Sequence, residues 1–135
     1  VNLGQLAASG AFMKPLSPDR RHVISGVFAA RVYHGGVLPM PTDQRDTYSR
    51  REQTVSVFIQ WNPQEKRETT GTFEVYDADN RPLVKSEPTK LKLKPNELFF
   101  STWTFRIERL PPETYRVDLS LDGAPIWRGW VRVTE

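Results

Sequence analysis

Few residues of this chain have the types and spacing that catalysis requires. The sequence contains no G-x-S-x-G turn, no Gly-rich phosphate loop and no H-E-x-x-H pair. Paired carboxylates support hydrolysis only when both face one cleft, and the acidic residues here lie mostly in predicted turns or beside basic neighbours. Cysteine is absent, which excludes disulfides, thiol catalysis and thiolate metal sites. We therefore expect no catalytic site and no cofactor.

Two histidines and one acidic turn are the groups to consider for metal binding. His22 and His34 bracket one predicted strand, and an extended chain would hold them about 40 Å apart, too far to share a metal. Each is expected at the surface, at a strand end. The run Asp77-Ala-Asp-Asn80 resembles the start of a calcium loop, but Pro82 and Pro88 stand where the loop needs its Gly and its bidentate carboxylate. We expect a turn stabilised by Asx side chains, and no metal site.

The residues that suit binding are aromatic and basic side chains near the C-terminal end. Residues 115–121 and 127–133 alternate apolar and polar residues on either side of Asp122-Gly123, which is the pattern of a β-hairpin. If Val131 and Val133 face inward, the outward residues are Trp130, Arg128 and Arg132, beside Arg116. Three interpretations of this exposed indole compete. Arg stems shield it through cation–π contacts, a protein partner covers it, or a sugar ring stacks on it.

Three more aromatic residues face away from the main apolar sets of their strands: Phe58, Phe100 and Tyr76. If they share one face with Trp130, that outer surface is aromatic enough to mark an interaction site. The alternative is that an N-terminal arm covers the face through Phe12 or Leu16. The predicted partner-binding residues are Trp130, Arg128, Arg132, Arg116, Phe58, Phe100 and Tyr76.

The elements that position these side chains are about seven to eight predicted strands. They span residues 22–34, 54–61, 71–77, 82–85, 90–94, 98–108, 115–121 and 127–133. Their regular spacing, without a convincing amphipathic helix, predicts an all-β, two-sheet antiparallel sandwich; a small barrel is the alternative. Residues 1–21 are read as an extended N-terminal arm and residues 22–135 as the domain. Residues 35–52 lack periodicity and are expected to form a long loop, either mobile or binding.

The run Leu110-Pro-Pro-Glu-Thr-Tyr115 resembles the start of the penultimate strand in immunoglobulin-like and fibronectin III-like domains. The resemblance implies that Tyr115 closes a corner by hydrogen-bonding the backbone upstream, and that Trp61 or Trp103 is the packed core indole. It covers the last third of the chain and extends to the rest by strand count. The Cys pair of antibody domains is missing. Such sandwiches serve adhesion, sugar binding, scaffolding and sensing, so the resemblance implies a fold without an activity.

Composition limits the class of protein further. The chain has 135 residues, enough for one domain with its own core. Its net charge of +3 is small and spread along the sequence, so nucleic acid is not an expected partner. No run approaches the roughly 18 apolar residues of a membrane span. The start, Val1-Asn-Leu, has neither an initiator Met nor a signal segment, and we expect a processed form or an excised piece.

Together these features predict a non-catalytic protein-interaction or structural module of an exported or cell-envelope bacterial protein. A periplasmic or cell-envelope location is expected from the usage of such folds, and a cytoplasmic one stays open. The expected partner is another protein or a second copy of the chain. A carbohydrate-binding module that uses exposed aromatics, with a glycan as partner, is one alternative, and a ligand-sensing domain is another.

Overall fold

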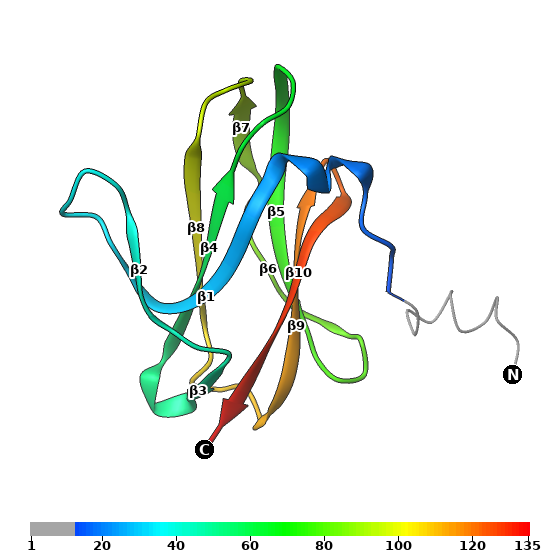
Figure 1. Ribbon diagram of the computed structural model, residues 1–135. Helices are drawn as coiled ribbons and strands as arrows, with labels where there is room; N and C mark the ends of the chain where they lie inside the picture. Colours follow the sequence, from blue (N-terminus) through cyan, green and yellow to red (C-terminus); the bar gives the residue numbers. More distant parts are fainter. Residues whose placement is uncertain (1–12) are drawn as a thin grey trace, which may run out of the picture.

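Two β-sheets pack face to face in the computed structural model, which describes residues 13–135 (Figure 1). Sheet A has the strand order β2-β1-β4-β8, with β1 at Val23–Tyr33, β2 at Met40–Gln44, β4 at Thr54–Trp61 and β8 at Phe99–Arg106. Sheet B has the order β3-β10-β9-β5-β6, and β7 also pairs with β5. Its strands are β3 at Thr47–Ser49, β5 at Arg67–Tyr76, β6 at Pro82–Lys85, β7 at Thr89–Leu93, β9 at Glu113–Leu121 and β10 at Ala124–Thr134. The predicted all-β, immunoglobulin-like sandwich is confirmed.

The prediction of wholly antiparallel sheets needs one correction. β3 pairs in parallel with the end of β10, with Tyr48 beside Val133, so sheet B is mixed. β3 lies in the segment 35–52 that was expected to be a loop. The same segment also contains β2 and a 3₁₀ turn, η2 (Arg50–Glu52), whose Ser49 and Glu52 form a reciprocal capping box.

Side chains that alternate along the strands fill the space between the sheets. On β4, Val55, Val57, Ile59 and Trp61 all point inward and are almost fully buried. Trp61 donates from Nε1 to Ser101 Oγ at 2.9 Å and stacks on Phe99 with ring centroids 5.5 Å apart. Each large apolar side chain buried in this way contributes roughly 1.5–3 kcal/mol to stability. Trp61 and Trp103 are both core indoles.

Tyr115 closes the corner that the resemblance implied. Its hydroxyl donates to the carbonyl of Pro111 at 2.5 Å, and the ring is fully buried. Burial raises the pKa of this phenol to about 12, because the ionised form loses its hydration there. The corner fixes the start of β9, and with it the direction in which the outward residues of β9 point.

One side of the sandwich is closed where β1 faces β10. The indole of Trp127 lies against Gly26 and Gly129, where a Cβ atom would come within 2.3 Å and 2.7 Å of the ring. Phe28 packs on the same indole with centroids 5.7 Å apart. Glycine at these two positions therefore lets the two sheets approach around Trp127.

The N-terminal arm can be followed from residue 13, while residues 1–12, including Phe12, fall outside the described part. Ser17 donates its backbone N–H to the carbonyl of Pro125 at 2.7 Å and caps a 3₁₀ turn, η1 (Pro18–His22). The prediction of a surface His22 is wrong, because η1 folds this ring into a fully buried position. His34 is exposed, as expected. No helix of residues 13–135 combines the length and apolar character that crossing a bilayer demands.

Candidate interaction surfaces

The predicted hairpin residues lie on the outer face of sheet B. Some of them are exposed there, and the others are held by ion pairs within the chain. Trp130 is 52% exposed and Arg132 is exposed. Arg128 is not free: its Nε and Nη2 donate to Asp118 at 2.7 Å and 3.0 Å. Arg128 also donates to the backbone carbonyl of Lys14 at 2.7 Å, which ties the arm to β10.

Arg116 belongs to the same buried ion network. Its Nε lies 3.4 Å from Asp118, its Nη1 donates to Asn80, and its guanidinium lies 4.1 Å over the Tyr76 ring. Burial and a hydrogen bond to Glu74 raise the pKa of Tyr76 to about 12. Arg116 and Arg128 are thus engaged within the chain, by Asp118 and Asn80. The cation–π contact, however, involves Tyr76 instead of Trp130.

Phe58 and Phe100 lie on the other sheet. They stack on the outer face of sheet A, with ring centroids 5.3 Å apart and planes 15° from parallel. The seven predicted residues therefore do not share one surface. The sequence pattern identified them as outward-facing but carried no signal for which of the two outer faces each would join.

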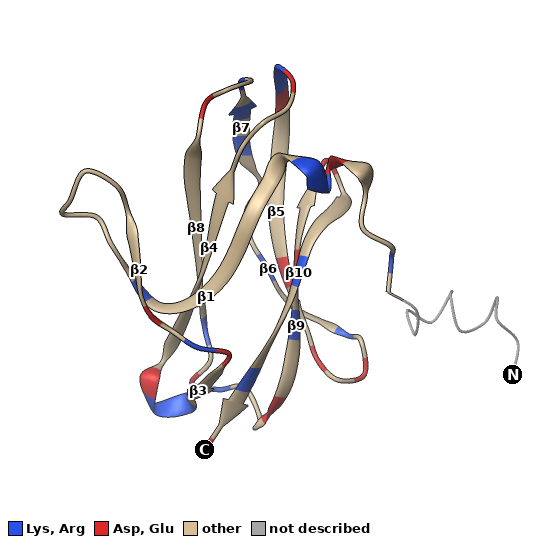
Figure 2. Cartoon of the chain, in the orientation of Figure 1, with Lys and Arg blue, Asp and Glu red and all other residues tan. Residues whose placement is uncertain are grey.

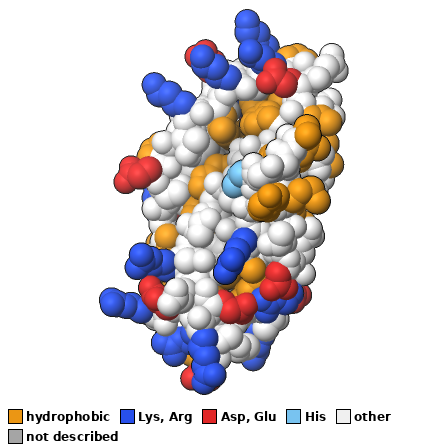
Figure 3. Space-filling view, turned by 90° about the vertical axis from the view of Figure 1, so that its left-hand side faces the viewer, with side chains coloured by type: hydrophobic (Ala, Val, Ile, Leu, Met, Phe, Trp, Pro, Cys, Tyr) orange, Lys and Arg blue, Asp and Glu red, His pale blue; other side chains and the backbone are white. Residues whose placement is uncertain are grey.

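The outer face of sheet A is the more apolar of the two surfaces. A register shift between Val23 and Ser25 turns Ile24 outward, and Leu98 is exposed near Phe100. Figure 3 shows hydrophobic side chains gathered on this side of the molecule. The exposed large apolar residues of this side and its hairpin are Ile24, Tyr33, Val37, Leu38, Met40 and Leu98.

The hairpin between β1 and β2 extends this face and projects from the sandwich (Figure 1). Residues 32–42 contain no Asp, Glu, Lys or Arg, and the tip carries no charged segment in Figure 2. Val37 is fully exposed, and Tyr33 is 61% exposed. Backbone pairs such as Tyr33 with Met40 hold the hairpin in place. This hairpin was not predicted, although the uncharged run with Val37, Leu38 and Met40 is visible in the sequence.

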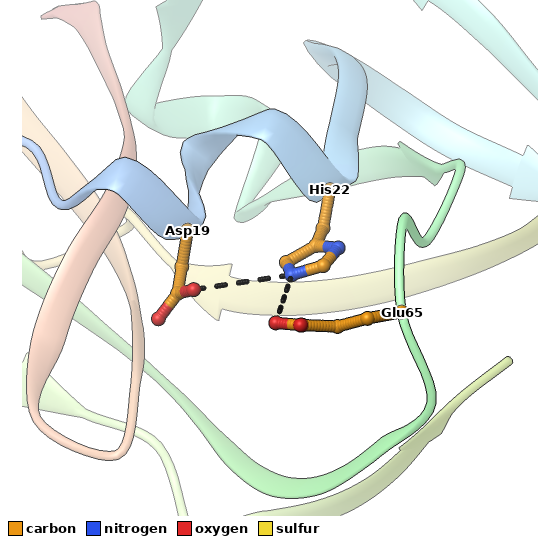
Figure 4. Close-up of side chains that lie close together, drawn as sticks. All are labelled: Asp19, His22 and Glu65. Carbon is orange, nitrogen blue, oxygen red and sulfur yellow. Dashed lines mark ion pairs between the residues drawn. The ribbon is translucent and has the colours of Figure 1, made fainter. Parts of the chain in front are cut away.

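A cluster of titratable groups lies where η1 meets the β4–β5 loop (Figure 4). His22 Nε2 lies 3.9 Å from Asp19 Oδ1 and 3.8 Å from Glu65 Oε1, and has no hydrogen-bond partner within residues 13–135. His22 Nδ1 accepts the backbone N–H of Gln64 at 3.0 Å. Burial, helped by the charge of Arg21, lowers the pKa of His22.

The proton on His22 decides what the cluster can bind. Because Nδ1 accepts a backbone N–H, the neutral ring keeps its proton on Nε2 and offers a donor to the carboxylates. A metal ion would need a lone pair at that atom. Both carboxylates are also already paired, Asp19 with Arg67 at 2.8 Å and Glu65 with Arg21 at 2.6 Å. The arrangement suits a polar anchor for η1, and it does not fit a metal centre.

The acidic turn after β5 behaves as its sequence predicts. Asp77 Oδ1 accepts the backbone N–H groups of Asp79 and Arg81 at 2.9 Å and 2.8 Å, which is an Asx-type turn. Those hydrogen bonds to the carboxylate lower the pKa of Asp77.

No known protein family and no curated protein matches this sequence. Among solved structures, an alkylpurine DNA glycosylase from Pseudomonas fluorescens matches with a TM-score of 0.52 and 7% identity, over 67% of this chain and 28% of that protein. An immunoglobulin-like protein from Pseudomonas aeruginosa matches with a TM-score of 0.48 and 11% identity, over 81% of this chain and 91% of that one. A β-glucosidase from Listeria innocua matches with a TM-score of 0.47 and 16% identity, over 82% of this chain and 16% of the enzyme.

These likenesses concern the fold alone, because identities this low carry no activity from one protein to another. The chain spans only a small part of the two enzymes. By its two packed sheets and its Tyr115 corner, it is an immunoglobulin-like β-sandwich.

Proposed function

We propose that this chain is a non-catalytic protein-interaction module of an exported or cell-envelope bacterial protein. Its main contact surface is the outer face of sheet A together with the β1–β2 hairpin. The observation that carries this proposal is the uncharged, projecting hairpin with Val37, Leu38 and Met40 exposed at its tip. The assignment to the cell envelope is supported by the common use of such sandwiches in cell-surface proteins.

The physical reason for a partner is the cost of leaving this surface in water. Burial of apolar area stabilises a contact by roughly 25 cal/mol per Å2, and contiguous apolar patches on soluble proteins generally mark interaction sites. The hairpin is held by its pairing with β1, so docking orders few new residues. Phe58 is only 7% exposed, so of the stacked pair only the half-buried Phe100 adds to the apolar surface of sheet A.

The face of Trp130 supports a second candidate function, carbohydrate binding. Its indole is half-exposed beside Arg132, and a sugar ring can stack on such a surface. Soluble glycans would then quench or shift the fluorescence of Trp130, and a Trp130→Ala variant would lose the response. A glycan array without hits, probed with folded protein, removes this alternative. Arg116 and Arg128 take no part in it because Asp118 holds both of them.

The experiment for the main proposal compares the native size of the protein in extracts of its own host. Val37→Ser, Leu38→Ser and Met40→Ser are combined in one variant, and Trp130→Ala with Arg132→Ala form the matched control on sheet B. The hairpin variant is expected to elute at a lower apparent mass than the wild type, while the control keeps its complex. An unchanged elution of the folded hairpin variant would refute the docking role of this surface.

A further inference from the structure

β8 is an edge strand of sheet A without the features that protect the other sheet edges. It runs for eight residues, contains no Pro, Lys or Gly, and pairs with β4 without a register shift. The other edge strands are protected against pairing. β7 carries Lys90 and Lys92, and β6 carries Pro82 and Lys85. β2 carries Pro41 and a left-handed Asp43, and β3 has only three residues. Natural proteins protect exposed edges in these ways because an open edge pairs with other strands.

The backbone groups that β8 leaves open follow from its register. Ile107 donates its N–H to the carbonyl of Gln53 at 2.8 Å, and Arg106 is in register with Thr54. In an antiparallel ladder, hydrogen-bonded pairs alternate with non-bonded ones. The backbone N–H and C=O groups of the inward-facing residues of β8 therefore form the hydrogen bonds to β4. The N–H and C=O groups of Phe100, Thr102 and Thr104 point to the open edge.

We propose that this edge pairs with β8 of a second copy of the chain, antiparallel about a two-fold axis at Thr102. Thr102 then lies opposite its own equivalent, and Phe100 lies opposite Thr104 of the second copy. Each of these residue pairs exchanges two N–H···O bonds, so every open backbone group of the three residues finds a partner. The two copies of sheet A become one continuous sheet.

A second copy fits this edge because the side chains are complementary to themselves, as a two-fold interface requires. On the outer face, threonine meets threonine at the axis and Phe100 meets Thr104, both favourable cross-strand combinations. Arg106 carries the single charge of the strand, and this register places it opposite Leu98 of the second copy, not opposite another arginine. Leu98 is 57% exposed, and the aliphatic stem of Arg106 can cover it.

This pairing would also bring the two outer faces of sheet A side by side. It rests on the β8 edge alone, so it does not depend on whether the β1–β2 hairpin binds a partner. Both proposals involve Phe100, but their tests substitute different residues, so their failures can be told apart.

Cysteine cross-linking tests the register directly, since the chain has no cysteine of its own. Directly opposed residues of a hydrogen-bonded pair have Cα atoms about 5.5 Å apart, within the range that a disulfide spans. Thr102→Cys should therefore form a disulfide dimer under mild oxidation. Thr104→Cys is the matched control: two such residues would be offset by four positions, roughly 13 Å, and should not cross-link. Equal cross-linking of both variants, or of neither, would overturn the proposal.

Sedimentation equilibrium of the purified protein tests the edge itself. The wild type should dimerise reversibly, and Thr102→Pro should raise the dissociation constant at least tenfold, because it removes an N–H from the open edge and none from the β4 ladder. Thr102→Ala keeps that N–H and should dimerise within about threefold of the wild type. A wild type that stays monomeric up to about millimolar concentration would overturn the proposal, and would indicate that any strand added at β8 comes from another protein.

Discussion

Replacing Asp118 with alanine removes the acceptor that two buried guanidiniums share. Arg128 makes a bidentate contact with this carboxylate, and Arg116 Nε lies 3.4 Å from it. The three side chains are only 8–10% exposed. The variant leaves two positive charges near each other with little water to solvate them. Breaking a buried ion pair from one side costs about 3–5 kcal/mol.

Urea unfolding, followed by Trp fluorescence, measures this loss. With a slope of about 1.5 kcal/mol per M, the midpoint should fall by roughly 2–3 M. Asp79→Ala is the matched control, because Asp79 pairs with Arg81 at 3.2 Å on an exposed surface and contributes about 1 kcal/mol or less. If Asp118→Ala costs no more than Asp79→Ala, then Arg116 and Arg128 are not held as the structure indicates, and they return to the set of possible partner-binding residues.

Two further variants test the corner and the buried histidine. Tyr115→Phe should lower the free energy of unfolding by about 1–2 kcal/mol, because the carbonyl of Pro111 loses its donor; an unchanged urea midpoint would show that the corner hydrogen bond is dispensable. Burial lowers the pKa of His22, so the folded state favours the neutral ring. The stability that depends on the neutral ring is therefore fully present above about pH 6.5 and is lost as the pH falls below that value. His22→Asn retains an acceptor for the Gln64 N–H and cannot titrate, so its stability should decline less between pH 7 and pH 5; identical slopes for both proteins would contradict this role.

The strands with clear alternation were predictable from the sequence, and so was the corner. Buried and exposed side chains alternate in the second half of β8 and at the end of β10. On β4 and β9 outward residues such as Phe58 and Asp118 are buried as well. The hydrophobic period of these strands still indicates which residues face inward. Tyr115 follows two prolines at the start of β9, where a turn must precede the strand. These signals are local, and each depends on residues close together in the chain.

The short strands β2 and β3 were not predictable in the same way. Pro41 and the left-handed Asp43 interrupt alternation in β2, and β3 is too short to show a period. β3 forms because Tyr48 is fully buried and its hydroxyl donates to the carbonyl of Asp43 at 3.0 Å. Its parallel pairing with the end of β10 joins residues about 85 positions apart, as Val133 and Tyr48 show, and no local pattern records that.

The sequence predicted which residues of the contact surfaces face outward, but not which sheet each of them belongs to. Alternation shows that Phe58 and Trp130 both face away from the core, but their strands belong to different sheets. The burial of Arg116 and Asp118 on an outer face also depends on groups brought in from elsewhere, among them Asn80 and Arg128. Long-range pairing therefore decided which outward side chains remain available to a partner.

Site-specific photo-crosslinking in the native host tests the contact surface most directly. A photoreactive phenylalanine analogue is placed at Leu38 on the hairpin, and in separate variants at Trp130 and at Lys92 on the solvent side of β7. A discrete cross-linked adduct to another protein at position 38, with none at position 92, is the predicted result. Adducts at position 130 but none at position 38 would contradict it, and would place the docking surface on sheet B.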